Sequence, residues 1–507
     1  MKLEHLLVPV TDAEYSGDGS VEINNLVCDS RKVQPGALFF ALPGVAANGH
    51  CFIGKACEAG AAAVVLEDAA SAPVGIPWVK VSDSRRAMSL IAATFNGNPT
   101  SKLPLIGITG TNGKTTTTYI IEAIMAAAGI PAAVLGTISY RFGGTTIAAS
   151  HTTPESTELQ AALRLLAEAG AKAFVMEVSS HALEQKRVDG CNFDVGIFSN
   201  LTRDHLDYHG SMEKYLDSKQ RLFSKLLRPT TGKPLRRAAI NMDDAYGAAV
   251  AERAACPVIT YGVDFTGDVR VMNVVSSVSG IQATLVTHMG EIPFASRLLG
   301  RFNLYNILAA ASAGIALKLP LPAIKAGIEG HDTVPGRLER VQNRSNVTLL
   351  VDYAHTGDAL DNVLRTLKEL ATGRIITVFG CGGDRDSGKR PIMGRIAAEM
   401  SDLSIVTSDN PRTEDPHFIM KQIKEGILPL GIREYTPEEL AGGDSEHGFV
   451  MIENRREAIR LAVRMARGED IILLAGKGHE DYQIIGTTKQ HFDDREEAAM
   501  AFMELGV

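Results

Sequence analysis

The pattern of hydrophobic and polar positions divides the chain into three blocks. Residues 1–99 hold short alternating apolar runs separated by turn signals, and they end at the helix-breaking cluster Asn96-Gly97-Asn98-Pro99. The next block alternates apolar strand-like runs with helical stretches, which predicts a parallel sheet flanked by helices. From residue 333 the same alternation begins again. We therefore predict an α/β protein with three domains, at 1–99, 100–332 and 333–507.

The apolar runs also predict individual strands. Residues 269–294 alternate with a period of two, which is typical of antiparallel strands and indicates an insertion in the central domain. The remaining runs are short and continuously apolar, as expected for buried strands of a parallel sheet. They lie at 104–109, 132–136, 173–178, 195–199, 348–352, 374–380, 404–407 and 471–475.

Composition narrows the class of protein. The 507 residues are 45% hydrophobic and 22% charged, the balance of an ordinary soluble protein. The net charge of −8 argues against nucleic acid as the main partner, because phosphate backbones select basic surfaces. No apolar run reaches the ~20 residues that span a bilayer, and the N-terminus lacks the order of a signal peptide. We therefore expect a cytoplasmic protein without a membrane partner.

Cysteine usage adds little chemistry. The six cysteines are scattered and form no Cys-x-x-Cys pair, so we predict neither a disulfide framework nor a zinc site.

A glycine-rich turn follows the first predicted strand of the central block. It reads Gly110-Thr111-Asn112-Gly113-Lys114-Thr115-Thr116, a compact form of the phosphate-binding loop rather than the standard Gly-x4-Gly-Lys spacing. Glycines let backbone amides surround phosphate oxygens, and the helix N-terminus adds a positive dipole end. Lys114 can reach the β- and γ-phosphates, and Thr115 can ligate Mg²⁺. The alternative is a turn with a solvated lysine, which the preceding strand and following helix disfavour.

Three further residues are candidates for the active site, and each also has a purely structural interpretation. Glu177 lies near the end of a predicted strand, where open α/β sheets bind ligands. His205 lies in the densest cluster of ionisable side chains, at 199–210. Each of these two residues has a second interpretation, that of a hydrogen-bonded polar residue or a helix cap. Lys219, judged by its own segment, is typical of a solvent-exposed helix lysine.

In combination, the ordered motifs resemble the Mur ligases, ATP-dependent amide-bond-forming enzymes of peptidoglycan precursor synthesis. The resemblance covers essentially the whole chain and is strongest to members that add meso-2,6-diaminopimelate. It implies an N-terminal α/β domain for a uridine nucleotide, a central P-loop ATPase-like domain and a C-terminal Rossmann-like domain. The other motifs that carry it are Asp29-Ser30-Arg31, His151-Thr152-Thr153-Pro154, Met176-Glu177-Val178-Ser179-Ser180-His181, Asn200, Asp204-His205-Leu206-Asp207, Phe302-Asn303-Leu304-Tyr305-Asn306, Pro335-Gly336-Arg337, Val351-Asp352-Tyr353-Ala354-His355-Thr356, Gly382-Gly383-Asp384-Arg385-Asp386, Asp409-Asn410-Pro411-Arg412 and Gly476-Lys477-Gly478-His479-Glu480.

The resemblance implies roles at the nucleotide and metal sites. Lys114, Glu177, His205 and Lys219 would be the catalytic residues. Thr115 and Glu177 would ligate one Mg²⁺, and His205 a second one together with Lys219, which the family carries as a carbamate. ATP would contact Gly110, Thr111, Asn112, Gly113, Lys114, Thr115, Thr116, Asn303, Asn306, Arg337 and Asp352.

The resemblance also implies the sites of the other substrates and the partner set. UDP-N-acetylmuramoyl-L-Ala-D-Glu would contact Cys28, Ser30, Val45, Ala46, Ala47, His151, Thr152, Thr153, Ser179, Gln185 and Arg187. Diaminopimelate would contact Arg385, Asp409, Asn410, Pro411, Arg412, Gly476 and Glu480. Arg412 is the expected selector, because a guanidinium can bind the distal carboxylate of diaminopimelate in a bidentate manner. We expect a monomer with ATP and these two substrates as its partners.

Two other functions would also explain the phosphate loop. A folylpolyglutamate synthetase has a similar phosphate loop, but the Asp29-Ser30-Arg31 and Asp409–Arg412 segments argue against it. A regulatory nucleotide switch would need neither the cluster around His205 nor the diaminopimelate loop.

Overall fold

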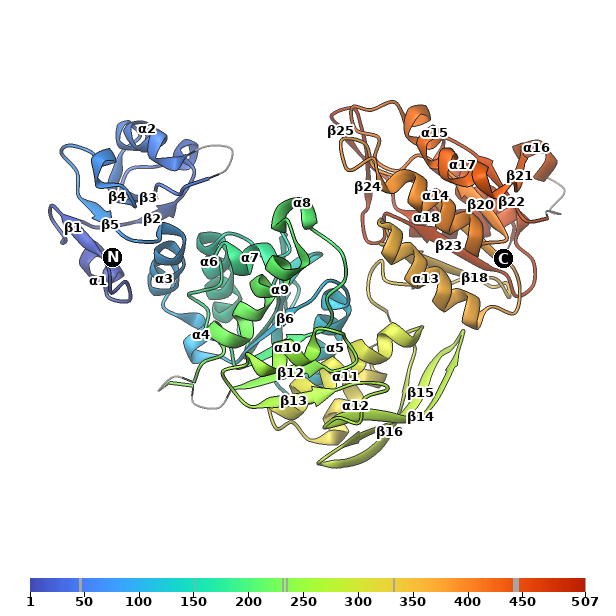
Figure 1. Ribbon diagram of the computed structural model, residues 1–507, viewed down its shortest axis with the longest axis horizontal. Coiled ribbons are helices and arrows are strands. Elements are labelled where there is room, and N and C mark those ends of the chain that lie inside the picture. The colour runs from blue at the N-terminus through green and yellow to red at the C-terminus, as the bar shows by residue number, and fades with distance from the viewer. Residues whose placement is uncertain are drawn as a thin grey trace. The chain divides into compact units, whose positions relative to one another are not determined.

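The computed structural model describes residues 1–44, 48–149, 151–229, 232–233, 236–331, 333–440 and 446–506 (Figure 1). The chain forms two compact units. The first comprises Met1–Met272, Thr284–Pro293 and Tyr305–Gly330, and the second comprises Asn273–Ala283, Phe294–Leu304 and His331–Val507. Among the described residues there are sheets of five, eleven, seven and two strands. The predicted α/β class is confirmed, whereas the boundaries at 99/100 and 332/333 remain predictions.

The first unit begins with the five-stranded sheet, in the order β1-β5-β4-β3-β2. Only β1 runs antiparallel to its neighbour. Successive residues point to opposite faces: Leu38 and Phe40 pack against α1 and α3, and Ala37 and Phe39 pack against α2. The elements are α1 (Leu3–Leu7), β1 (Glu14–Ser16), β2 (Asn25–Val27), β3 (Ala37–Phe40), α2 (Ile53–Glu58), β4 (Ala61–Leu66), β5 (Trp78–Lys80), α3 (Ser84–Phe95) and α4 (Pro99–Lys102).

The eleven-stranded sheet has the order β16-β15-β14-β13-β12-β11-β6-β10-β7-β8-β9. Strands β6 (Leu105–Thr109), β7 (Ala132–Leu135), β10 (Ala173–Glu177) and β11 (Val195–Phe198) confirm the four strands predicted in this block. They are parallel, and β6 pairs with β10 on one side and β11 on the other. The carboxyl ends of these three strands therefore meet at one edge, where open α/β sheets bind ligands.

The rest of this sheet completes the central block. Strands β14 (Val269–Ser277), β15 (Gly280–Thr287) and β16 (Gly290–Ser296) are neighbours joined by two-residue turns, so the predicted antiparallel insertion is confirmed. The hairpin of β8 (Ser139–Phe142) and β9 (Thr145–Ala148) was not predicted. The other elements are α5 (Lys114–Ala127), α6 (Ser156–Glu168), α7 (Ser180–Glu184), α8 (Leu206–His209), α9 (Met212–Arg221), β12 (Arg237–Asn241), α10 (Gly247–Glu252), β13 (Val258–Tyr261), α11 (Arg301–Ala316) and α12 (Leu321–Glu329).

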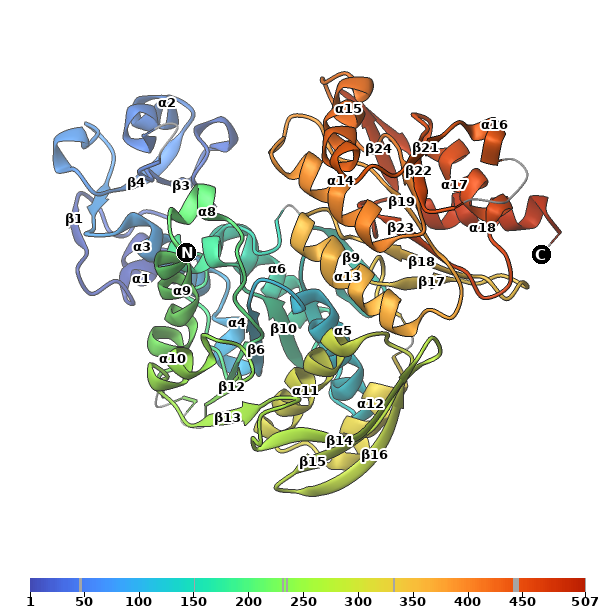
Figure 2. The same ribbon diagram turned by 45° about the vertical axis from the view of Figure 1, so that its right-hand side comes forward.

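The second unit is built on the seven-stranded sheet, in the order β17-β18-β23-β19-β20-β22-β21. Helices α13, α14 and α15 pack on one face (Figure 2), and α17 and α18 pack on the other. Six strands are parallel and β17 is antiparallel. The elements are β17 (Glu339–Val341), β18 (Thr348–Asp352), α13 (Gly357–Leu370), β19 (Ile375–Phe379), α14 (Lys389–Met400), β20 (Leu403–Val406), α15 (Pro416–Ile427), β21 (Arg433–Tyr435), α16 (Pro437–Leu440), β22 (Gly448–Met451), α17 (Arg455–Met465), β23 (Ile471–Ala475), β24 (Tyr482–Ile485), β25 (Thr488–His491) and α18 (Asp494–Glu504).

Within the described ranges, none of the helices combines the length and the apolar character needed to cross a bilayer.

Candidate active site

The glycine-rich turn joins β6 to α5 at the carboxyl edge of the central sheet. Gly113 precedes the helix with φ 87°, a left-handed conformation, and a Cβ atom there would collide with Asn306 Oδ1. Lys114 Nζ donates to the carbonyl oxygens of Gly110 at 2.9 Å and Thr111 at 2.8 Å. The lysine therefore folds back over the loop, as a phosphate-binding lysine must.

Glu177 ends β10 beside this loop and is 1% exposed. Its Oε1 accepts from Thr115 Oγ1 and from the Thr137 amide, each at 3.0 Å, and its Oε2 accepts from Thr137 Oγ1 at 3.1 Å. The structure thus brings the predicted pair Thr115 and Glu177 together. Thr137, which the sequence did not single out, follows the end of β7 and holds the carboxylate in place.

The donor set here consists of oxygens. Within the part of the chain that the structure describes, no group of three or more His, Cys, Asp and Glu residues could hold a metal by itself. A hydroxyl and a carboxylate nevertheless fit Mg²⁺, which prefers oxygen and usually takes its remaining ligands from water and substrate phosphates.

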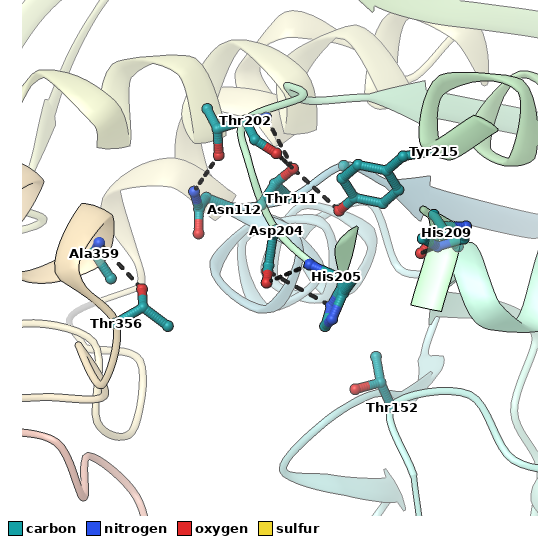
Figure 3. A network of polar contacts seen from close by, with 12 residues as sticks. Thr111, Asn112, Thr152, Thr202, Asp204, His205, His209, Tyr215, Thr356 and Ala359 are labelled. Carbon is teal, nitrogen blue, oxygen red and sulfur yellow. Dashed lines mark hydrogen bonds and ion pairs between the residues drawn. The ribbon is translucent and has the colours of Figure 1, made fainter. Parts of the chain in front are cut away.

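Figure 3 shows the polar contacts around the loop on its other side. Thr111 Oγ1 lies 3.2 Å from Tyr215 OH, and Thr202 contacts both Thr111 and Asn112. His205 begins α8 with φ 52°, and its Nε2 lies 3.5 Å from Asp204 Oδ2. The ring centres of His205 and Tyr215 are 6.2 Å apart, so the predicted histidine lies beside a residue that contacts the phosphate loop.

Lys219 corrects the interpretation drawn from its own segment. Instead of being solvent-exposed it is 1% exposed, and its Nζ lies 4.5 Å from the centre of the Tyr215 ring. Burial lowers the pKa of Lys219 well below its usual value, and the nearby Lys114 cation lowers it further. The surroundings therefore favour the neutral, nucleophilic form of the amine.

Helix α9 explains how a lysine comes to lie inside. Tyr215, Ser218 and Lys219 are buried at helical spacing, so they share the face that packs on the domain core. Ser218 Oγ donates to Ser180 O at 2.7 Å. His209 stacks on Tyr215, with ring centres 4.9 Å apart, and burial lowers the pKa of His209 to about 4. Sequence reasoning missed this buried layer, because Ser218 and Lys219 are polar and the segment shows no apolar pattern.

The residues expected at the peptide end also meet. Thr153 Oγ1 donates to Glu177 O at 2.8 Å and accepts from the Ser179 amide at 3.0 Å. Arg187 donates to Thr153 O at 2.9 Å and to Gln185 Oε1 at 2.7 Å. These four residues therefore form one group beside Glu177.

Other residues expected to contact the uridine substrate are less connected to that group. Thr152 Oγ1 lies 3.1 Å from Thr137 Oγ1, and the backbone oxygen of His151 accepts from Tyr140 OH at 2.7 Å. Cys28 and Ser30 follow β2 in the N-terminal sheet, where burial raises the pKa of Cys28 to about 11. Val45, Ala46 and Ala47 lie outside the described residues.

The second unit holds the expected amino-acid residues. Asp409–Arg412 follows β20, and Asn410 Nδ2 donates to Glu480 Oε2 at 3.0 Å. Arg412 has φ 51° and donates through Nη1 to Gly383 O at 2.7 Å. Burial, and then Asp409, raise the pKa of Glu480. Carboxylates and a guanidinium thus converge here, a combination that suits the two charges of an amino acid.

Four further residues belong to the loops that carry the expected amino-acid site. Pro411 is buried and Gly476 passes Asp409 with φ 114°, where a Cβ atom would lie 3.5 Å from Asp409 Oδ2. Arg385 is exposed on the loop after β19. Sequence reasoning did not assign Lys477, whose Nζ lies 3.5 Å from Asp409 Oδ1.

The remaining residues expected at ATP divide between the units. Asn306 belongs to the first unit and faces Gly113. Asn303, Arg337 and Asp352 belong to the second unit. Asp352 ends β18 and accepts from the Leu338 and Ala354 amides at 2.8 Å, while burial raises its pKa.

Comparison with known families decides the class. Residues 22–96 match the catalytic domain of the Mur ligase family, 108–314 the Mur ligase middle domain and 336–478 the Mur ligase glutamate ligase domain. The chain belongs to the Mur ligase family. Two curated relatives are named UDP-N-acetylmuramoyl-L-alanyl-D-glutamate–2,6-diaminopimelate ligase. That of Geobacter metallireducens is 63% identical over 100% of this chain and 99% of its own, and that of Geobacillus kaustophilus is 43% identical over all of both chains.

Solved structures agree with this assignment. A structure with the same ligase name covers 100% of this Mur ligase and 99% of its own chain, with a TM-score of 0.72 and 34% identity. The folylpolyglutamate synthase of Mycobacterium tuberculosis, at 19% identity, covers 76% of this chain and 91% of its own with a TM-score of 0.59. At that identity the likeness concerns the fold alone.

Proposed function

We propose that this Mur ligase joins meso-2,6-diaminopimelate to UDP-N-acetylmuramoyl-L-Ala-D-Glu at the expense of ATP, in cytoplasmic peptidoglycan precursor synthesis. The observation that carries the proposal is the 63% identity, along the whole chain, to a relative named for this reaction. The geometry of both units supports it. The three domains at 1–99, 100–332 and 333–507 would take the uridine nucleotide, ATP and the amino acid, respectively.

The phosphate loop would hold ATP. The loop Gly110–Thr116 and Lys114 Nζ would hold the β- and γ-phosphates, and Asn306 Oδ1 lies against Gly113. Asn303, Arg337 and Asp352 would contact the nucleotide from the second unit. Thr115 and Glu177 would hold Mg²⁺, and His205 with a carboxylated Lys219 a second ion. The metal would supply positive charge that offsets the charge of the transferring phosphoryl group.

The environment of Lys219 supports its conversion to a carbamate. A neutral amine can attack CO₂, forming an N–C bond and releasing a proton, whereas an ammonium group cannot. Burial lowers the pKa of Lys219 and so provides the neutral amine. The product is an anion, which suits its position near the Lys114 cation.

The reaction then follows in two steps. The γ-carboxylate of the D-glutamyl residue attacks the γ-phosphorus of ATP. ADP leaves, and an acyl phosphate forms. The amine of diaminopimelate attacks the activated carbonyl, and the tetrahedral intermediate expels phosphate. Lys114 and Arg187 counter the repulsion between the two anions in the first step, and the phosphate-loop amides orient the phosphoryl group. Thr152, Thr153, Ser179 and Gln185 would hold the peptide in line, and Cys28 and Ser30 the uridine end.

The pocket after β20 would select the amino acid. Arg412 would bind the distal carboxylate of diaminopimelate in a bidentate manner, with the exposed Arg385 assisting. Asp409, Asn410 and Glu480 would accept from the distal ammonium group. Lysine lacks that carboxylate, so the guanidinium would contribute nothing to its binding.

Incubation of the full chain with ATP, Mg²⁺ and the UDP-dipeptide, plus either diaminopimelate or lysine, tests the proposal. We expect phosphate release and a tripeptide product with diaminopimelate. The kcat/KM with diaminopimelate should be at least about 100-fold higher than with lysine. Absence of product with diaminopimelate, or glutamate addition to a folate, would overturn the proposal. A lysine preference would overturn the pocket assignment alone.

A further inference from the structure

A fully buried lysine lies beside the amino-acid pocket. Lys477, between β23 and β24, is 0% exposed. Its Nζ lies 3.5 Å from Asp409 Oδ1 and 3.6 Å from Glu480 Oε2, and it donates to the carbonyl oxygen of Tyr482. One cation therefore bridges the two acids that the pocket would offer to a ligand.

The two carboxylates depend on this lysine. Asp409 Oδ1 is buried and accepts no hydrogen bond from the residues that the structure describes. Glu480 Oε2 accepts from Asn410 Nδ2 at 3.0 Å. A pair of neighbouring buried carboxylates is unfavourable unless a cation or a proton neutralises part of its charge. Lys477 supplies that charge from a position that a ligand does not need.

The formal charges then match a particular ligand. Asp409 and Glu480 carry two negative charges and Lys477 one positive charge, so the acid side has room for one further cation. We propose that Lys477 is a positioning residue for specificity: it offsets part of the negative charge of Asp409 and Glu480 and holds the two carboxylates adjacent, so that together they accept one ammonium group. This inference rests on the proposed function and adds a residue to it.

Loss of the lysine should make the acid pair take up a proton. Burial and Asp409 already raise the pKa of Glu480, and Lys477 opposes that rise. A ligand ammonium group would then have to displace the proton, so binding would strengthen as the pH rises. The charged or titratable groups that the structure records near the pair are Arg412, Arg455, Tyr353, Tyr482, His355, Cys381 and Lys477.

The first test is Lys477→Met, which keeps most of the side-chain volume. At pH 7 we expect the KM for diaminopimelate to rise at least about 10-fold, with kcat and the KM for ATP within about 3-fold of the parent. The ratio of variant to parent KM should fall from pH 6 to pH 9, by up to about tenfold per pH unit for one displaced proton. A ratio independent of pH would overturn the proposal.

A matched control separates the loss of a buried lysine from the loss of this one. Lys233 is also buried and pairs with a carboxylate, Asp194 Oδ2, at 2.5 Å. Lys233→Met should lower the melting temperature and leave the KM for diaminopimelate and its pH dependence unchanged. A pH-dependent KM in that variant too would mean that general destabilisation causes the effect.

The decisive test reverses the sign of the effect. Glu480→Gln leaves Asp409 paired with Lys477, a neutral site that should bind an ammonium group poorly. Adding Lys477→Met to Glu480→Gln restores one negative charge, so the double variant should have a KM for diaminopimelate at least about 3-fold lower than Glu480→Gln alone, without pH dependence. A merely space-filling lysine would make the double variant worse.

This comparison also carries the test if Lys477→Met alone does not fold, because both Glu480→Gln proteins contain fewer unbalanced charges. Activity of the parent with diaminopimelate together with a worse double variant would reject this inference and leave the proposed function standing.

Discussion

Two buried lysines, one in each compact unit, have opposite surroundings. Lys219 is 1% exposed and lies over the Tyr215 ring, with the Lys114 cation among its neighbours, and its pKa is lowered well below the usual value. Lys477 is 0% exposed and lies within 3.6 Å of two carboxylates. Burial is the same, so the neighbours decide the chemistry. The first site favours a neutral amine that can react, and the second places a lysine between two carboxylates that it can hold in position.

Substitution of Lys219 should give the largest effect. Lys219→Ala removes the group that would carry the carbamate, and we expect kcat to fall about 100- to 1000-fold. Acetate or formate in solution should restore part of the rate, because a small carboxylate can replace the missing anion. Phosphate release, measured with and without the acid, checks both expectations.

The comparison supplies two controls for this prediction. Lys214 lies exposed on the same helix, so Lys214→Ala should keep its activity. Small acids should not restore Lys477→Met, which would lack a cation rather than an anion. A fully active Lys219→Ala protein, or equal rescue of both lysine variants, would remove the distinction between the two sites. The carbamate itself can be observed by ¹³C NMR in ¹³C-bicarbonate.

Substitution at Arg412 should have the next largest effect. Arg412→Lys keeps the charge but loses the planar pair of donors, so the KM for diaminopimelate should rise about 10- to 100-fold with little change in kcat. The preference over lysine should shrink by a similar factor, because only diaminopimelate uses the guanidinium. Initial rates with both amino acids give the two values.

The exposed arginine of α14, Arg395, offers a matched control, since its guanidinium pairs with Glu399 at 2.7 Å. Arg395→Lys should change neither KM nor the preference. An unchanged diaminopimelate KM in Arg412→Lys would assign the distal carboxylate to another group.

The two lysines also differ in what the sequence could predict. The phosphate loop and Glu177 stand at strand ends, so local patterns were sufficient to single them out as candidates, whereas Arg412 was named through the family resemblance. Strands β6, β7, β10 and β11 were likewise predicted, because each is a short run of buried apolar residues. Lys219 by contrast lies in the polar segment Met212–Arg221, whose buried face exists only through its packing on Ser180 and Thr111.

Lys477 was missed for a related reason. Its role depends on Asp409, which is distant in sequence and becomes a neighbour only when β20 and β23 end at the same edge of their sheet. The β8–β9 hairpin escaped prediction because its two short strands, Ser139–Phe142 and Thr145–Ala148, show little apolar alternation. Charged residues that act within one short motif can be recognised from the sequence. Partners that come from different strands, such as Lys477 and Asp409, can be recognised only in the folded structure.

Substitution of Tyr215, beside Lys219, should have the smallest effect. Tyr215 has two functions in the structure: its hydroxyl lies 3.2 Å from Thr111 Oγ1, and its ring covers Lys219 Nζ. Burial raises the pKa of Tyr215 to about 12, so the hydroxyl stays protonated. Tyr215→Phe removes one neutral hydrogen bond of about 1 kcal/mol and keeps the ring, so the KM for ATP should rise about 2- to 5-fold, with the carbamate retained.

Tyr215→Ala should in addition admit water to Lys219, raise the pKa of Lys219 and reduce the ¹³C carbamate signal. Equal carbamate signals in both variants would show that the ring does not keep the amine neutral, and that burial by the rest of the core is sufficient.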